Sequence, residues 1–319
     1  MDFFPSFFNL LVIFLKSITY SITKKQIKGE INMEKILHCL NWKLEDIREN
    51  LEVIKEQGFT MVLTSVLQGQ KDDGSEWWKA YQPLHFDIKD NRLGNEKELR
   101  NLCAKGNEIG VKVMVDVVFD HVADGEFNEF NSKVTIPRRL QRTKEQVSDW
   151  NNRWQVTNLS SGNLPHLNYN VLELQELAFK YIDKLINIGV SAIRIDQCKH
   201  IALPNEGSTF FRNLLHRYSD KLCIYGEVIF VPGWLIDEYS KYIIPITEVV
   251  NYSYNVCTFY ESHDTYYNFG GKDNNNDYDT IRGYKEVVLR NKRAVLFFAR
   301  PFNDTWKSNE IKEINNLKF

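Results

Sequence analysis

The sequence lacks any marked excess of charge. Its 319 residues include 40 Lys and Arg and 42 Asp and Glu, which gives a formal net charge of −2, and the isoelectric point is about 6.4. A chain this close to neutrality has no general electrostatic attraction for nucleic acid or for an anionic membrane surface. We therefore expect neither nucleic acid nor membrane as a partner.

Cysteine is scarce, and its number is odd. Most of the cysteines fall in segments with the pattern of strands or helices, and no pair has the spacing of a zinc site. Buried free thiols in a reducing compartment are therefore favoured over disulfides. The five residues are Cys39, Cys103, Cys198, Cys223 and Cys257.

Long apolar runs are missing as well. The run from Phe3 to Leu15 is too short to cross a bilayer. It follows Asp2 instead of a basic residue, and no small-residue cleavage site comes after it, so it is also a poor signal peptide.

Lys28-Gly29-Glu30 can be encoded by a purine-rich stretch that resembles a bacterial ribosome-binding site ahead of Met33. We interpret residues 1–32 as a leader or mistranslated upstream segment, with a weak membrane anchor as the alternative. A start at Met33 predicts a cytoplasmic protein.

From residue 33 onward, the hydrophobic pattern alternates between strand and helix. Asn95, followed by Glu98, predicts a capping box at the start of one helix. Strands separated by helices form parallel sheets, and about eight of them indicate an α/β fold of the (β/α)8 TIM barrel type. The predicted strands cover residues 35–40, 61–66, 111–118, 190–195, 222–227, 245–251, 256–261 and 293–299.

One connection in this pattern is unusually long. Residues 122–170, after the third strand, show no regular period and far exceed an ordinary loop. We interpret them as a small inserted domain, with residues 33–121 and 171–319 forming the barrel.

Another connection is unusually short. The sixth and seventh predicted strands are nearly contiguous, so helix 6 of the barrel is missing. Either the sixth strand still pairs and its connection is strained, which we favour, or it is displaced and the barrel gapes. In both cases we expect apolar side chains such as Val256 and Phe259 to be partly bare, and the chain to be marginally stable or to self-associate.

Charged side chains gather where the predicted strands end. The stretch GVSAIRIDQCKH, residues 189–200, places Arg194 and Asp196 on one face of a strand end. Asp116 lies near the end of the third strand, with Asp120 and His121 just beyond it. Glu227 ends the fifth strand, and Glu261-Ser262-His263-Asp264 follows the seventh.

The carboxyl ends of barrel strands meet at one rim, so Asp196, Glu227 and Asp264 should converge. A single strand-end carboxylate is more often a structural ion pair, but three together favour catalysis. Metal-dependent hydrolysis is a rival interpretation. No histidine pair has the spacing of a helical zinc site, which argues against it.

These four strand ends resemble, in order, the four signature regions of the α-amylase family of glycoside hydrolases. The stretch LHCLNW at residues 37–42 and the segment after Tyr81-Gln82-Pro83 are similar to the branch of secreted bacterial amylases. The resemblance covers about residues 35–302. It implies retaining hydrolysis of α-1,4-glucosidic bonds in starch-like glucans or maltooligosaccharides.

The resemblance also implies a role for individual residues. Asp196 would be the nucleophile, Glu227 the general acid and base, and Asp264 the stabiliser of the transition state. The retaining mechanism needs one ionised and one protonated carboxyl group, and we expect the Arg194 guanidinium to lower the pKa of Asp196. The residues implied to bind substrate are Tyr81, Gln82, His121, Arg194, Lys199, His200 and His263.

Calcium is the cofactor that the resemblance implies, bound by oxygen atoms between the inserted domain and the barrel. Asp120 and His200 are the candidate ligands. His166 stands where the family has a ligating Asp, and Gln155 replaces another acid. Imidazole is a poor calcium ligand, so these two substitutions argue against the metal.

The chain departs from the family in one further respect. A short helix is predicted within residues 308–319, but the β-sandwich domain common in the family does not follow.

Three function hypotheses stay open: an active hydrolase, a transglycosylating relative, and an inactive or truncated glucan-binding remnant. Retention of all three carboxylates favours the first.

Overall fold

A computed structural model describes residues 33–71, 73–89, 91–125, 130–142, 144–248 and 255–318. The prediction made for residues 1–32 lies outside this range. No helix among the described residues is long and apolar enough to span a membrane.

Eight strands form a closed barrel in which each pairs in parallel with the next and the last pairs with the first. This arrangement confirms the predicted (β/α)8 fold. The predicted strand boundaries agree to within a few residues, and residues 249–251 of the predicted sixth strand lie outside the described residues. The strands are β1 (Glu34–Cys39), β2 (Met61–Val66), β3 (Lys112–Val117), β4 (Ala192–Ile195), β5 (Cys223–Glu227), β6 (Ile244–Thr247), β7 (Cys257–Phe259) and β8 (Ala294–Phe298).

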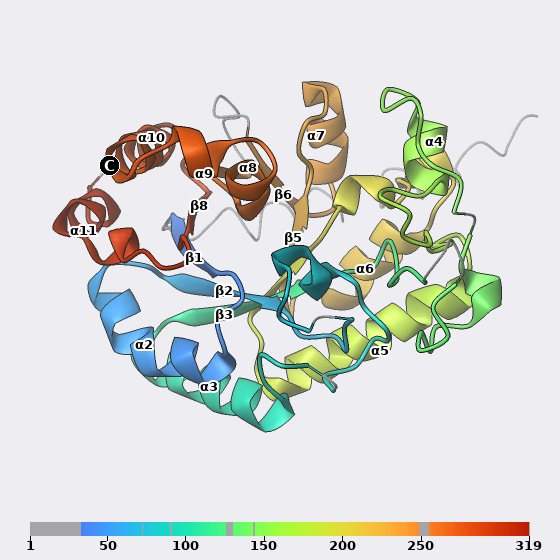
Figure 1. Cartoon of the computed structure of the whole chain (residues 1–319), viewed down its shortest axis with the longest axis horizontal. Helices are drawn as coiled ribbons and strands as arrows, with labels where there is room; N and C mark the ends of the chain where they lie inside the picture. Colours follow the sequence, from blue (N-terminus) through green and yellow to red (C-terminus); the bar gives the residue numbers. More distant parts are fainter. Residues whose placement is uncertain are drawn as a thin grey trace, which may run out of the picture. The chain divides into compact units, whose positions relative to one another are not determined.

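Helices surround these strands (Figure 1). The capping box predicted at Asn95 is present, because Asn95 Oδ1 accepts from the Glu98 N–H at 3.1 Å and Glu98 Oε2 accepts from the Asn95 N–H at 2.8 Å. The longer helices are α2 (Leu44–Glu56), α3 (Glu96–Ile109), α5 (Leu172–Ile188), α6 (Phe210–Tyr218), α7 (Gly233–Ser240), α10 (Asp277–Arg290) and α11 (Asn309–Asn315). Shorter ones are α4 (Arg153–Asn158), α8 (His263–Tyr267) and α9 (Gly271–Asn274).

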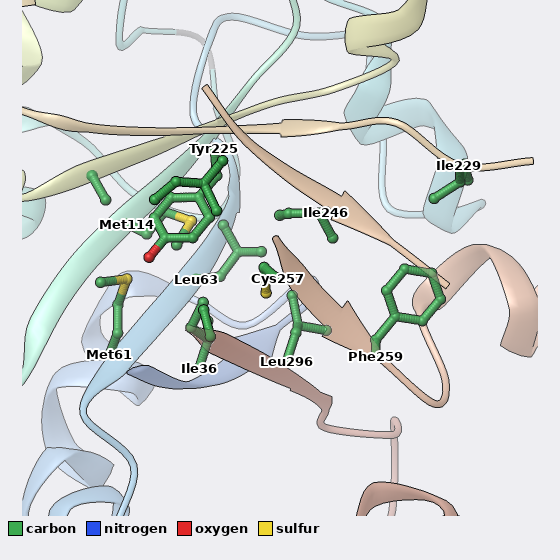
Figure 2. Close-up of a cluster of buried hydrophobic side chains, with 13 residues drawn as sticks. Ile36, Met61, Leu63, Met114, Tyr225, Ile229, Ile246, Cys257, Phe259 and Leu296 are labelled. Atoms are coloured by element: carbon green, nitrogen blue, oxygen red, sulfur yellow. The ribbon is translucent and has the colours of Figure 1, made fainter. Parts of the chain in front are cut away.

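Apolar side chains fill the interior of the barrel (Figure 2). Alternate residues of a strand face the same side, so pairs such as Ile244 and Ile246 both belong to the buried interior cluster. Side chains from the other strands complete the cluster, including Met61, Leu63, Met114, Tyr225, Cys257 and Leu296. Because this part of the barrel is solid, the chemistry is confined to the ends of the strands.

The short connection after β6 does not open the barrel. Strand β6 pairs with both β5 and β7, which confirms the predicted pairing of the sixth strand. Residues 249–254 of the connection lie outside the described residues, so its expected strain stays a prediction. Nine residues separate Thr247 from Cys257, and those that the structure describes there are not helical.

The expected bare apolar surface at this position is wrong. Val256 is 2% exposed and Phe259 is 3% exposed. Phe259 belongs to the interior cluster, and α10 packs against both β7 and β8. Asn291, which follows α10, donates from Nδ2 to the Val256 carbonyl at 3.1 Å and to Thr258 Oγ1 at 2.8 Å. Contacts from α10 and from Asn291 thus cover β7, although no helix was predicted between β6 and β7.

The long connection after β3 contains little regular structure. Among its described residues are a single 3₁₀ turn at Arg138–Leu140 and the short helix α4. Isolated bridges join His121 to His166 and Gln141 to Leu167, so its far end returns to the rim of the barrel. The boundaries proposed for an inserted domain stay a prediction.

Candidate active site

The predicted site residues lie at the carboxyl ends of the strands. Asp116 is on β3, Arg194 on β4 with Asp196 just after it, and Glu227 is the last residue of β5. His263 and Asp264 begin α8, which follows β7. Ser262 holds the start of that short helix, because its Oγ accepts from the Thr265 N–H at 3.3 Å.

Arg194 is the centre of this arrangement, and it is buried. Its Nη1 donates to both carboxylate oxygens of Asp116, at 2.9 and 2.8 Å, and to Asp196 Oδ1 at 2.8 Å. Its Nη2 donates to Glu227 Oε1. One guanidinium therefore orients three buried carboxylates. The other carboxylate oxygen of Glu227, Oε2, accepts a hydrogen bond from the backbone N–H of Gln197 at 3.1 Å.

The electrostatics of this group differ from what the sequence predicted. Burial raises the pKa of Asp196 well above its usual range; Arg194 opposes this rise, but the charges of Glu227 and Asp116 add to it. The expected lowering of the Asp196 pKa is therefore wrong. Burial likewise raises the pKa of Asp116 to about 6 against the effect of Arg194. A single positive charge cannot offset both the desolvation and the mutual repulsion of three carboxylates.

Asp264 stands at the edge of this group. Burial raises its pKa, while Arg194, Lys199 and Asn268 act in the opposite direction. Asn268 Nδ2 donates to Asp264 Oδ1 at 3.2 Å, and His263 Nε2 lies 3.5 Å from Asp264 Oδ2. The side chain is thus fixed from both ends of α8.

Aromatic side chains form one wall of the site. The rings of Tyr81 and His263 stack with centroids 5.2 Å apart and planes at 4°. Trp77 meets both rings edge-on and itself stacks on Tyr267 at 4.9 Å. The Tyr81 hydroxyl donates to Asp116 Oδ2 at 3.0 Å, which connects the aromatic wall to the carboxylate group.

These residues surround a cavity of about 440 Å³, a size that suits a small-molecule site. Seven of the predicted site residues line it: Tyr81, Gln82, His121, Asp196, Glu227, His263 and Asp264. Three others do not line it. Arg194 lies buried among the carboxylates, Lys199 Nζ donates to the Ile229 carbonyl at 3.1 Å, and the His200 ring packs edge-on against Trp150.

The cavity also has lining residues that sequence reasoning missed. They are Trp77, Trp78, Asp124, Gly162, Leu164, Gln197 and Asn268. The two tryptophans lie just before Tyr81-Gln82-Pro83, so their proximity to that motif was a usable signal. Gly162 and Leu164 come from the irregular connection after β3, where no sequence pattern marked them.

His121 is held in a defined protonation pattern. Its Nε2 lies 2.8 Å from the Tyr81 carbonyl oxygen, which can only accept, so Nε2 carries a hydrogen. Its Nδ1 lies 2.9 Å from Asp120 Oδ1. Burial lowers the pKa of His121, but the Asp120 carboxylate outweighs this effect and the pKa lies above its usual value.

The residues around Asp120 do not fit calcium, which takes six to eight oxygen ligands. The imidazoles of His121, His200 and His166 are the groups whose electrostatic effect lowers the pKa of Asp120, against the effect of burial. Gln155 Oε1 instead accepts from the N–H groups of Ser148 and Asp149, at 3.0 and 2.9 Å. Within the described residues, the group that could hold a metal comprises Asp120, His121 and Asp196, and Asp196 is already bound by Arg194. His200, the second predicted ligand, is not part of that group.

Comparison with known proteins gives consistent matches. The model of the α-amylase catalytic domain matches residues 40–291. An α-amylase of Clostridium acetobutylicum is 27% identical over 349 residues, which cover 95% of this chain and 45% of that protein. The chain thus spans about half the length of this curated relative.

Solved structures share the fold at low identity. The α-amylase I of Eisenia fetida superposes with a TM-score of 0.74 at 17% identity, covering 89% of this chain and 77% of that chain. The cyclomaltodextrin glucanotransferase CldA superposes with a TM-score of 0.70 at 14% identity, covering 89% and 79%.

Proposed function

The chain belongs to the α-amylase family, and from that membership we propose that it hydrolyses α-1,4-glucosidic bonds in starch-like glucans or maltooligosaccharides, with retention at the anomeric carbon. The observation that carries the proposal is the arrangement of Asp116, Asp196 and Glu227 around one buried guanidinium at the edge of a cavity. A retaining glycosidase requires two carboxyl groups that flank the cleaved bond, and Arg194 binds both Asp196 and Glu227 here.

The proposed reaction has two steps. Asp196 attacks the anomeric carbon while the bond to the leaving oxygen breaks, and Glu227 gives its proton to that oxygen. Glu227, now a carboxylate, then takes a proton from water, whose oxygen attacks the same carbon and releases Asp196. Arg194 orients both carboxylates throughout, and Asp264 faces the positive charge that develops on the sugar.

The lining of the cavity supports a sugar as the substrate. The stacked rings of Tyr81 and His263 offer a flat surface for an apolar sugar face. Gln82 and His121 present polar atoms beside it. This combination of one aromatic wall with a few fixed polar groups is typical of small-molecule sites.

We also propose that the protein acts without calcium. His121 Nδ1 lies 2.9 Å from Asp120 Oδ1, and although burial lowers the pKa of the imidazole, the carboxylate raises it above its usual value, which favours the protonated ring. A protonated His121 in this position would balance the charge of the Asp120 carboxylate, which in the family would be near the metal.

The activity is tested by reducing-sugar release from soluble starch, with the full chain compared with Asp196→Asn and Glu227→Gln. Each substitution should abolish release, since neither carboxyl group can replace the other. Asp304→Asn is the control, because the side chain of that aspartate is 76% exposed and its ion pair with Lys307, at 3.0 Å, lies on the surface.

Far-ultraviolet circular dichroism should show the same fold in all four proteins. An Asp196→Asn protein within tenfold of wild-type turnover contradicts the assignment. Starch binding by the wild type without any cleavage would favour a glucan-binding remnant. Products longer than the substrate would favour a transglycosylase, the activity that the name of CldA gives for that protein.

A further inference from the structure

Glu261 opens the strand-end motif Glu261-Ser262-His263-Asp264 but has no role in the proposed reaction. It is 3% exposed, and it is not among the residues that line the cavity. A carboxylate buried away from the substrate is costly unless a partner compensates its charge. The position of Glu261 therefore calls for a reason of its own.

Arg300 is the partner of this carboxylate. It lies two residues beyond the end of β8 and is 8% exposed. Its Nε donates to Glu261 Oε2 at 2.7 Å and its Nη2 to Glu261 Oε1 at 2.9 Å, the paired arrangement in which a guanidinium fits a carboxylate. Arg300 Nη1 also donates to the Asn275 carbonyl at 3.1 Å, and Asn275 Nδ2 donates to Glu261 Oε1 at 3.2 Å. We call Glu261 and Arg300 the rim pair.

The rim pair joins the segment that carries Asp264 to the neighbouring strand. Glu261 stands just before α8, whose first residues are His263 and Asp264. Helix α9 lies beside α8 (Figure 1). A Cβ at Gly271, where α9 begins, would lie 2.9 Å from Glu261 Oε1 and 2.8 Å from the Thr265 carbonyl oxygen. The start of α8, the start of α9 and the end of β8 are thus packed tightly around one carboxylate.

Asp264 needs an anchor of this kind. Helix α8 has five residues, and a helix so short is not stable by itself. His263 and Asn268, which contact the Asp264 carboxylate, lie at the two ends of α8 and move with it. They cannot set the distance of that carboxylate from Asp196 and Glu227. A buried ion pair adds little stability over an apolar pair of the same volume, so the rim pair is better explained by a need for fixed geometry.

We propose that Arg300 is a positioning residue for the hydrolysis, which acts through Glu261 to hold Asp264 against the reacting sugar. Asp264 has to face the positive charge that develops on that sugar. A displacement of about 1 Å at a reacting group can lower the rate about 10²-fold. This inference rests on the proposed function, because it assumes the role that the proposed reaction gives to Asp264.

Arg300→Lys tests the proposal, because lysine keeps the positive charge beside Glu261 and loses the paired hydrogen bonds. With a nitrophenyl maltotrioside as substrate, kcat should fall at least about tenfold. KM should stay nearly unchanged, since the lost interaction acts in the transition state. Arg217→Lys is the matched control on the outer helix α6, where Arg217 pairs with Glu176 at 3.0 Å and with Asp183 at 2.7 Å. It should leave both constants unchanged.

A second background separates positioning from a general structural role. In Asp264→Asn, the group that Arg300 positions is gone, so adding Arg300→Lys should lower kcat by less than about twofold further. The same fold-loss in both backgrounds, a loss confined to KM, or no loss in the single variant overturns the proposal. Circular dichroism at the assay temperature checks that each variant is folded. If Arg300→Lys is not, Glu261→Leu combined with Arg300→Met takes its place with the same expected losses, because it leaves no charge unpaired.

A further measurement distinguishes this inference from the proposed hydrolysis. A wild-type protein that cleaves no substrate refutes the hydrolysis alone. Calorimetry then compares deoxynojirimycin, a glucose analogue whose ring amine is protonated, with neutral maltose. Arg300→Lys should bind deoxynojirimycin about fivefold more weakly than the wild type and maltose equally well. Unchanged affinity for deoxynojirimycin, equal weakening of both ligands, or no binding of deoxynojirimycin to the wild type overturns the positioning role.

Discussion

Replacing Arg194 with methionine tests the charge arrangement on which the active site depends. The guanidinium is 3% exposed and donates to Asp116, Asp196 and Glu227. Methionine has a similar length and no charge, so it fills much of the space and removes the cation. The three carboxylates would then face one another in a buried site with no positive partner in contact.

The expected loss can be estimated from this geometry. Removing one partner of a buried ion pair costs about 3–5 kcal/mol in the free energy of unfolding, and here three carboxylates lose their partner. Protonation limits the loss. Without Arg194, the pKa values of Asp116 and Asp196 rise further above the value of about 4 that they have in the unfolded chain. The folded variant then binds more protons than the unfolded one, so its stability falls as the pH rises.

Urea unfolding at pH 5 and pH 8 measures both parts of this expectation. Arg194→Met should lose about 3–5 kcal/mol at pH 8 and clearly less at pH 5. Arg290→Met is the matched control, since Arg290 is 54% exposed and pairs with Glu286 on the surface; it should lose less than about 0.5 kcal/mol. A deficit for Arg194→Met below about 1 kcal/mol at pH 8, or one of equal size at both pH values, refutes the reasoning.

Two further predictions concern stability. Chelation of divalent ions should change the midpoint of thermal unfolding little, because His166 and Gln155 leave the Asp120 region short of oxygen ligands; a rise of many degrees with millimolar calcium would show that the site is intact. Gly106→Ala should destabilise the fold by more than about 1 kcal/mol, although alanine favours helices, because its Cβ would lie 2.4 Å from the Val111 carbonyl oxygen. Urea unfolding that shows a more stable variant would mean that α3 can shift away from this oxygen.

Much of the site could be predicted because its residues interrupt a simple pattern. Arg194 and Asp196 stand at the end of a short apolar run, where burial of charge requires a reason. Glu227 ends another such run. Both runs are parallel strands, and a barrel brings their ends together. The positions of these charged residues in the sequence were therefore enough to predict that they converge.

Other features depend on packing and could not be predicted in this way. The direction of the Asp196 pKa shift follows from the balance of burial against one guanidinium and two neighbouring carboxylates. The burial of Val256 depends on the contact of α10 with β7, which the local sequence around Val256 does not reveal. Gly162 and Leu164 reach the cavity from an irregular segment with no period to interpret.

The shared guanidinium also bears on the protonation of the carboxylate group that it binds. Asp116, Asp196 and Glu227 would carry three negative charges against the single positive charge of Arg194. Full ionisation is unfavourable in a buried site, so the group retains protons toward neutral pH, in accord with the raised pKa values of Asp116 and Asp196. The proposed reaction needs one protonated and one ionised carboxyl group at the same time. A second cation beside these carboxylates would favour full ionisation, whereas with Arg194 alone the raised pKa values of Asp116 and Asp196 favour a group that still holds a proton.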